Sequence, residues 1–366
     1  MRCILLNPGP VSLSDTVRKA AVGSDLCHRE PEFFELQDEL RQGLLDVYGC
    51  PADEWAPIPL GGSGTTALEA MLTSLVPRDA RLLVIENGVY GERIRRIAEI
   101  HGIEHHAIDH AWLDAIDFER VEAELSAGLY THVAAVHHET TTGRLNDVRR
   151  LAELCDSHGA ALLLDTVSSF GAEDIPFDAP ALVGCAVTAN KCLHGIPGLC
   201  FVIARYAALA TAAEPPRSLY LHLPLWLEKQ EAQTTPFTPS VNGFLALRQA
   251  LVELHAQGGW QARRARYREL AGQVREALAG LGVHALLDAG ESSCALTSYR
   301  LPDGFSYEQV HDGLKRWGFV IYAGQGSLVA EMFRISTMGD ITRYDMERLM
   351  AAVETAVSYT HLTLPT

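Results

Sequence analysis

The sequence lacks a long apolar run and is poor in positive charge. No segment approaches the roughly 18 uninterrupted apolar residues of a membrane span, and the apolar run in the N-terminal MRCILLNPGPVS is too short for a signal peptide. The chain has 30 Lys and Arg against 46 Asp and Glu, which gives a net charge of −16. Such a charge repels nucleic acids and anionic membranes alike, so we expect neither as a partner and predict a cytoplasmic protein.

Cysteine and histidine are present but lack the spacing of a metal site. The eight cysteines include no C-x-x-C pair, and most lie in apolar runs, as reduced buried thiols do. The histidine pairs at 105–106 and 137–138 also lack metal-ligand spacing, and no acidic cluster accompanies them. We therefore predict neither disulfides nor a bound metal.

Apolar strands alternate with amphipathic helices in the first part of the chain. This order is typical of an α/β fold, with a mostly parallel sheet that helices cover on both faces. Apolar residues recur at three-to-four spacing over 67–76 and 148–158, which predicts helices there. The clearest strands are 81–86, 132–137, 160–165, 184–189 and 199–204.

A proline-rich stretch at 214–240 interrupts this alternation, and we expect it to be irregular. The chain is long enough, and with 48% hydrophobic residues apolar enough, to form two domains. After two further helices, strands near 283–287, 294–300, 319–322 and 331–335 predict a smaller α+β domain. We divide the chain into an N-terminal arm (1–15), a large domain (16–257), a small C-terminal domain (258–357) and an extension without a role (358–366).

The sequence Gly61–Thr66, GGSGTT, stands directly ahead of a predicted helix. Exposed backbone N–H groups, hydroxyls and the positive end of the helix would converge there, which suits an anion such as a phosphate. The segment lacks the Gly-Lys-Ser/Thr of a nucleotide P-loop. A purely structural capped turn is an equally good interpretation of these residues alone.

Two charged residues end neighbouring apolar strands. Asp165 closes ALLLD, where a parallel sheet presents its ligands, and Lys191 follows the next strand 26 residues later. A lysine in apolar surroundings has a lowered pKa and becomes an amine nucleophile toward an aldehyde. The alternatives are a carboxylate that only caps the next turn, through Thr166 or Ser168, and a solvated surface lysine.

Arg334 lies in the middle of the apolar segment MFRIS. A guanidinium there needs a carboxylate partner, and the bidentate carboxylate of a small molecule would serve. An ion pair within the protein is an equally good interpretation.

An anion-binding turn, a strand-end Asp and a strand-end Lys are together what pyridoxal phosphate requires. The sequence resembles the class V aminotransferases over essentially the whole chain, up to about Val357. The segments that carry the resemblance are LLNPGPVSLS, GGSGTTALEAML, ENGVYGERI, HHETTTGRLND, LLLDTVSSFGA, TANKCLHGIPG, RSLYLHLPLW, PFTPSVN, GFVIYAG and FRISTMGDI. The resemblance implies a pyridoxal-phosphate-dependent transaminase of fold type I, with a mostly parallel, seven-stranded sheet in the large domain.

The resemblance also implies a substrate class. The ETTTG and NKCxxGxPG forms favour the branch that moves the amino group of 2-aminoethylphosphonate to pyruvate. The alternative is a branch that uses alanine or serine with glyoxylate.

The resemblance assigns the cofactor contacts. Lys191 carries the cofactor as a Schiff base and moves the proton of the substrate, and Asp165 pairs with the pyridine nitrogen. Ser63, Gly64 and Thr65 hold the phosphate.

Further contacts are implied for the cofactor ring and for the second subunit. Tyr90 stacks on one ring face, Val167 packs on the other, and Thr140 lies near the phenolic oxygen and the substrate. Thr238 reaches the phosphate from the neighbouring subunit of a homodimer with shared active sites.

Three arginines are the expected substrate contacts. By resemblance, Arg334 binds the carboxylate of pyruvate and alanine. A phosphonate needs local positive charge in so acidic a protein, and Arg29 and Arg217 are our candidates for it.

Two other functions fit the same fold. A cysteine desulfurase-like lyase needs a reactive cysteine on a mobile loop, whereas Cys294 is part of a predicted strand. A non-catalytic sensor with this fold is disfavoured because Lys191 and Asp165 are both present.

Overall fold

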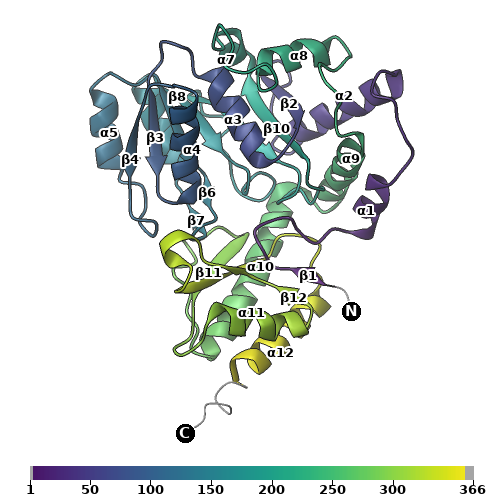
Figure 1. Cartoon of the computed structure of the whole chain (residues 1–366), viewed down its shortest axis with the longest axis vertical. Coiled ribbons are helices and arrows are strands. Elements are labelled where there is room, and N and C mark those ends of the chain that lie inside the picture. The colour runs from purple at the N-terminus through teal and green to yellow at the C-terminus, as the bar shows by residue number, and fades with distance from the viewer. Residues whose placement is uncertain (1–2, 359–366) are drawn as a thin grey trace.

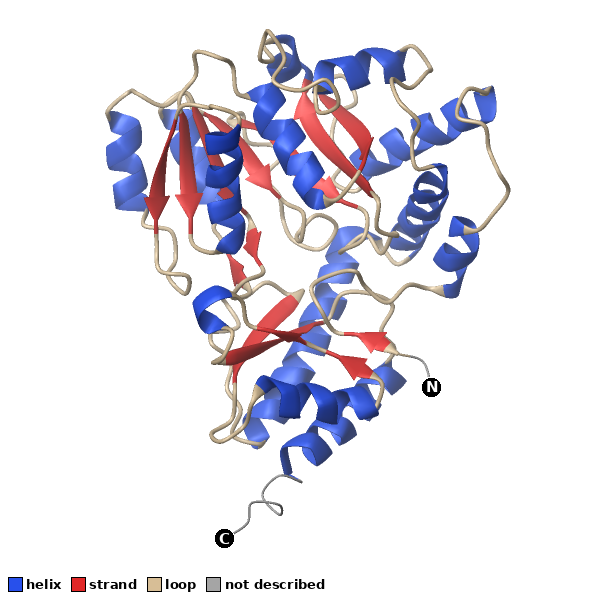
Figure 2. Ribbon diagram, in the orientation of Figure 1, coloured by secondary structure: helices blue, strands red, loops and turns tan. Residues whose placement is uncertain are grey.

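The computed structural model describes residues 3–358 and shows a large sheet-containing part above a smaller one (Figures 1 and 2). Apart from Ser358, the predicted extension 358–366 lies outside the described residues. Within residues 3–358, no helix is long and apolar enough to cross a membrane.

The large part is built on one seven-stranded sheet, in the order β2-β10-β9-β8-β5-β3-β4. The sheet is parallel except for β10, which pairs antiparallel with both of its neighbours. The prediction of a mostly parallel, seven-stranded sheet is therefore confirmed. The strands are β2 (Trp55–Gly61), β3 (Leu82–Glu86), β4 (His105–Asp109), β5 (His132–Val136), β8 (Ala161–Asp165), β9 (Leu182–Thr188) and β10 (Leu199–Arg205).

Helices cover both faces of this sheet, because the strands are apolar on both sides. Leu82 and Val84 of β3 pack in one core cluster, and Leu83 and Ile85 pack in another. The first cluster contains residues of α3 (Gly64–Leu75), α4 (Val89–Ile100), α7 (Tyr206–Ala210) and α8 (Leu223–Glu231). The second contains residues of α1 (Asp15–Ala21), α2 (Pro31–Asp46), α5 (Phe118–Ser126), α6 (Val148–Ser157) and α9 (Val241–Ala256).

The segment 214–240 is more ordered than we expected. It contains α8, which begins with Pro224 in its first turn, where the missing N–H of proline costs no helical hydrogen bond. The expectation of a wholly irregular stretch is therefore wrong for these residues.

The smaller part has its own core around a three-stranded antiparallel sheet, in the order β11-β14-β13. The predicted strand at 283–287 is reduced to a single bridge between Ala285 and Tyr299, because the chain turns at Asp288, whose carbonyl accepts two backbone N–H groups. The elements are α10 (Gly259–Gly280), β11 (Leu296–Arg300), α11 (Tyr307–Arg316), β12 (Phe319–Val320), β13 (Tyr322–Ala323), η1 (Gly326–Leu328), β14 (Met332–Ser336) and α12 (Arg343–Ser358).

The N-terminal arm joins the smaller part. Its strand β1 (Ile4–Leu5) pairs in parallel with β12, so two segments far apart in the sequence lie side by side (Figure 1). Ile4 is fully buried in the smaller core. Before it reaches α1, the arm passes Asn190 and Lys191, at the edge of the large sheet where the parallel strands end.

Candidate active site

The predicted site residues follow the carboxyl ends of the parallel strands, which meet at one edge of the sheet. Asp165 ends β8, and Lys191 comes shortly after β9. Ser63 follows β2, and Tyr90 opens α4 after β3. Thr140 lies in the turn between β6 (His138–Glu139) and β7 (Arg144–Leu145). The topology therefore gathers segments that are far apart in the sequence.

Lys191 is half-buried and faces the ring of Tyr90, with its Nζ 6.0 Å from the ring centroid. The N-terminal arm covers its methylene groups: a Cβ added at Gly9 would lie 3.0 Å from Lys191 Cε. Gly9 also has φ of 113°, which favours glycine. The arm thus limits where the amine can move.

Asp165 is buried, with 4% of its surface exposed. Its Oδ1 accepts the backbone N–H of Val167 at 2.9 Å, so the carboxylate does cap the turn, although not through Thr166 or Ser168. Burial raises the pKa of Asp165, while the Val167 N–H and the nearby cations Lys191 and Arg93 lower it. One hydrogen bond does not compensate a fully buried charge, so a further cationic partner fits here.

The glycine-rich turn caps α3, and the backbone of the turn lies close to the side chain of Val167. Ser63 is the N-cap residue, and its N–H donates to Thr66 Oγ1 at 3.1 Å. A Cβ at Gly64 would lie 2.7 Å from Val167 Cγ1, so a larger residue would close the space. Thr65 Oγ1 accepts from Arg93 Nη1 at 3.2 Å. The turn has the hydroxyls and the helix end that an anion needs.

Arg334 is buried in the centre of β14 and points to the large part. Its Nε donates to the Ala323 carbonyl at 2.9 Å, and its Nη1 donates to the Thr140 carbonyl at 2.8 Å and to Gln325 Oε1 at 3.2 Å. Within the described residues it forms no ion pair with a carboxylate. Burial lowers the pKa of Arg334. An intraprotein ion pair is therefore not the reason for this arginine.

Glu139 is a site residue that the sequence reasoning missed. Its Oε2 accepts the N–H groups of Tyr90 and Gly91 at 3.1 and 3.3 Å, in the first turn of α4. Its Oε1 accepts the N–H and hydroxyl of Thr141 at 3.0 and 2.6 Å. Burial raises the pKa of Glu139 to about 7 despite these donors. The buried carboxyl group thus fixes the backbone that carries the Tyr90 ring.

The structure separates two of the predicted substrate contacts from this cluster. Arg217 donates to the carbonyls of Thr73, Val76 and Pro77 and so caps the carboxyl end of α3, opposite to the end that carries Ser63. Twelve helical residues span about 18 Å. Both terminal nitrogens of its guanidinium are used there, at the end of α3 far from Ser63, so Arg217 is not a substrate contact.

Arg29 and Thr238 lie on the surface of this chain. Arg29 Nη1 lies 3.3 Å from both Thr234 Oγ1 and the Thr235 carbonyl, so it joins the α1–α2 connection to the segment that carries Thr238. Neither residue contacts the cluster around Lys191 in the contacts that we observe within residues 3–358.

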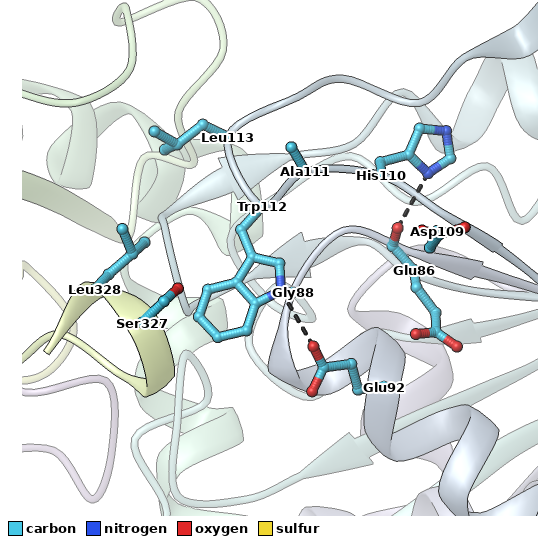
Figure 3. Close-up of a pocket in the computed structure, with 10 residues that line it drawn as sticks. All are labelled: Glu86, Gly88, Glu92, Asp109, His110, Ala111, Trp112, Leu113, Ser327 and Leu328. Carbon is cyan, nitrogen blue, oxygen red and sulfur yellow. Dashed lines mark hydrogen bonds between the residues drawn. The ribbon is translucent and has the colours of Figure 1, made fainter.

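A pocket of about 500 Å³ lies on the outer side of the α4 start (Figure 3). It is lined by three carboxylates, and Trp112 donates to Glu92 Oε1 at 3.2 Å across it. The ring of Trp112 also covers Gly326, where an added Cβ would lie 2.4 Å from the ring. The acidic lining does not suit an anionic substrate. The three carboxylates that line the pocket are those of Glu86, Glu92 and Asp109.

Known proteins share both this sequence and this fold. The family described as Aminotransferase class-V matches residues 17–349. A 2-aminoethylphosphonate–pyruvate transaminase of Phocaeicola vulgatus is 35% identical over 358 residues, covering 96% of this chain and 98% of that protein. One from Syntrophobacter fumaroxidans is 38% identical over 361 residues, covering 97% and 96%.

Solved structures of aminotransferases share the fold of this chain. An aspartate aminotransferase of Thermus thermophilus superposes with a TM-score of 0.88 at 27% identity, covering 97% of this chain and 99% of that one. A pyridoxamine-pyruvate aminotransferase of Mesorhizobium loti gives 0.87 at 27% identity, covering 99% and 93%. The fold and the site thus define a fold-type-I aminotransferase. The chain belongs to the class-V aminotransferase family, as its sequence predicted.

The cofactor that the family implies is pyridoxal 5′-phosphate, and the residues present fit it. Thr140 Oγ1 is buried and has no hydrogen-bond partner among the described residues, which suits a contact with a ring oxygen. The buried carboxylate of Asp165 suits a protonated ring nitrogen. The missing side chain of Gly64 leaves space for a phosphate at the amino end of α3. Each feature matches a different part of the cofactor.

Proposed function

We propose that this enzyme transfers the amino group of 2-aminoethylphosphonate to pyruvate, which yields phosphonoacetaldehyde and L-alanine. The observation that carries the proposal is the buried Arg334 guanidinium, which lies beside Thr140 without a carboxylate partner in the described chain. The relatives that share this activity in name match nearly the whole chain.

We assign the cofactor contacts as follows. Lys191 is the attachment lysine, Asp165 faces the pyridine nitrogen, and the first turn of α3 holds the phosphate through Ser63, Gly64 and Thr65. Tyr90 and Val167 take the two ring faces, and Thr140 faces the phenolic oxygen. When bound, the cofactor supplies an electron-withdrawing ring that acidifies the carbon bearing the substrate amino group.

The protein's own groups then control the proton. With the cofactor bound, the free Lys191 amine would act as general base and acid: it would take the proton from the substrate carbon that bears the amino group and deliver it to the cofactor carbon bonded to that nitrogen. The Asp165 carboxylate keeps the ring nitrogen protonated, because a buried negative charge stabilises a cation beside it. The arm at Gly9 restricts Lys191 to this region.

Arg334 serves the pyruvate half-reaction more than the donor half-reaction. The donor 2-aminoethylphosphonate carries no α-carboxylate, whereas pyruvate and alanine do. The guanidinium exchanges its neutral acceptors, the Thr140 carbonyl and Gln325 amide oxygen, for the carboxylate of pyruvate, and charge-assisted bonds are about twice as strong as neutral ones. The arginine thereby favours a 2-oxo acid such as pyruvate as the acceptor.

We further propose that the active unit is a homodimer in the cytoplasm. Thr238 is exposed near the end of segment 214–240, which also exposes the apolar Leu219. Thr238 is therefore free to contact the phosphate site of a partner subunit. All eight cysteines are free thiols, and six of them are buried, as suits a reducing compartment.

An amino-donor comparison tests the substrate. The purified enzyme with pyruvate should form alanine much faster from 2-aminoethylphosphonate than from serine or aspartate. Rapid alanine:glyoxylate exchange without turnover of 2-aminoethylphosphonate would overturn the proposal and favour the glyoxylate-using branch.

A further inference from the structure

Helix α4 carries three arginines in its second and third turns, and they differ in their partners. Arg95 pairs with Glu86 at 2.7 Å and with Glu99 at 2.5 Å, and Arg96 pairs with Glu99 at 2.9 Å. Arg93 forms no ion pair with a carboxylate among residues 3–358. Its charge is therefore not neutralised by the protein in the way that its two neighbours are.

Arg93 instead points toward the first turn of α3. It lies three residues after Tyr90, on the same face of α4, and its Cζ is 4.5 Å from the centroid of the Tyr90 ring. Its Nη1 donates to Thr65 Oγ1 at 3.2 Å. The ring contact and the hydrogen bond together hold a half-buried guanidinium at the glycine-rich turn.

The other groups of this turn are neutral. Ser63 and Thr65 provide hydroxyls and backbone N–H groups, and the end of α3 provides a partial positive charge of roughly half an elementary unit. A phosphate monoester carries nearly two negative charges at neutral pH. In a chain of net charge −16, such a dianion needs a full positive charge nearby.

We infer that Arg93 is the cationic partner of the cofactor phosphate at the first turn of α3. The Nη1 that donates to Thr65 turns to a phosphate oxygen, while the guanidinium remains on the Tyr90 ring. Charge-assisted Arg–phosphate bonds are both stronger and more directional than the hydroxyl contact that they replace.

The same guanidinium also acts on the other end of the cofactor site. Arg93 lowers the pKa of Asp165, together with Lys191 and the Val167 N–H. The positive charge therefore favours the ionised form of the carboxylate that faces the ring nitrogen.

Binding of two aldehydes to the apoenzyme tests this inference. Pyridoxal 5′-phosphate and pyridoxal differ only in the phosphate, and absorbance titration gives the affinity for each. Arg93→Gln should weaken the binding of pyridoxal phosphate by roughly 10- to 100-fold, since a hydrogen bond to a charged group is lost. Its affinity for pyridoxal should fall much less, because only the influence of Arg93 on Asp165 is lost there, and retained binding of pyridoxal also shows that the pocket is folded.

Arg96→Gln, in the same helix but on the surface, is the matched control and should bind both aldehydes as the unmodified enzyme does. Arg93→Met, which keeps a long unbranched side chain without the charge, repeats the test if the Gln variant is unstable. An unchanged affinity for pyridoxal phosphate, or an equal loss for both aldehydes, would overturn the inference. The inference rests on the proposed cofactor site, not on the substrates. If the unmodified enzyme did not prefer pyridoxal phosphate over pyridoxal, the cofactor assignment itself would fail.

Discussion

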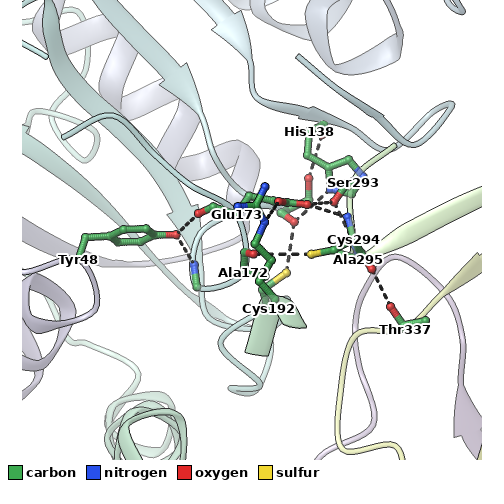
Figure 4. A network of polar contacts seen from close by, with 12 residues as sticks. Tyr48, His138, Ala172, Glu173, Cys192, Ser293, Cys294, Ala295 and Thr337 are labelled. Atoms are coloured by element: carbon green, nitrogen blue, oxygen red, sulfur yellow. Dashed lines mark hydrogen bonds and ion pairs between the residues drawn. The ribbon is translucent and has the colours of Figure 1, made fainter. Parts of the chain in front are cut away.

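The buried carboxylate of Glu173 links the two parts of the molecule, and its removal should be costly (Figure 4). Glu173 is fully buried in the segment after β8. Its Oε1 accepts the Ser293 hydroxyl and the Cys294 N–H, both at 2.7 Å, just before β11. Its Oε2 lies 3.0 Å from Arg264 Nε in α10, as an ion pair that is not aligned for a hydrogen bond. One side chain thus holds three groups of the smaller part.

The cost of Glu173→Ala follows from what it leaves behind. The buried Cys294 N–H loses its acceptor, which costs about 1–3 kcal/mol. Breaking a buried ion pair costs about 3–5 kcal/mol, but the Arg264 side chain is 25% exposed and recovers part of this from water. We expect a total loss of about 3–5 kcal/mol in the free energy of unfolding. Glu173→Gln keeps one acceptor and should lose roughly half as much.

Urea unfolding at one fixed protein concentration measures this loss, because oligomer stability depends on concentration. The control is Arg149→Ala, which breaks exposed pairs with Asp174 and Asp178 and should cost less than about 1 kcal/mol. If Glu173→Ala were no more costly than this control, the link between the two parts would not be stabilising, and our interpretation of the network would be wrong.

Three further predictions concern the site. Arg334→Ala should slow the pyruvate half-reaction roughly 10- to 100-fold more than the donor half-reaction; single-turnover kinetics measure both, and equal losses would reject the division of labour. The pKa of Glu139, about 7, lies above the unfolded value of about 4.3. The stability of the unmodified enzyme relative to Glu139→Gln should therefore fall by roughly 3 kcal/mol as pH rises from about 4.5 to 7; unfolding that shows no such pH dependence would mean that Glu139 stays ionised. Because Thr238 is assigned to the partner's site, the enzyme should lose activity and cofactor on dilution to a monomer; a fully active monomer in analytical ultracentrifugation would contradict shared sites.

The strand ends were predictable from the sequence because the strands are nearly continuous apolar runs. Where such runs alternate with helices, the strands run parallel, and the residues that end them lie at one edge of the sheet. Asp165 and Lys191 could therefore be placed on the same side of the sheet without a structure. The family resemblance added Tyr90 and Thr140, which periodicity alone does not indicate.

The contacts of long polar side chains could not be predicted in the same way. Arg217 and Arg93 are both arginines near α3, but one caps its carboxyl end and the other reaches its amino end. The direction of a flexible side chain depends on which carbonyls or hydroxyls the folded chain leaves unpaired. Glu139 was missed for this reason as well, since its partners lie 49 and 48 residues earlier.

Covalent trapping of the cofactor tests the central claim most directly. The chain has only four lysines, Lys19, Lys191, Lys229 and Lys315, so peptide mapping after borohydride reduction gives an unambiguous answer. Lys19 and Lys315 are exposed, and Lys229 pairs with Glu228 on α8, away from the strand ends. We predict that the reduced pyridoxyl label is found on Lys191, and that Lys191→Ala takes up none. A label on another lysine, or equal labelling of the Lys191→Ala variant, would contradict the site described here.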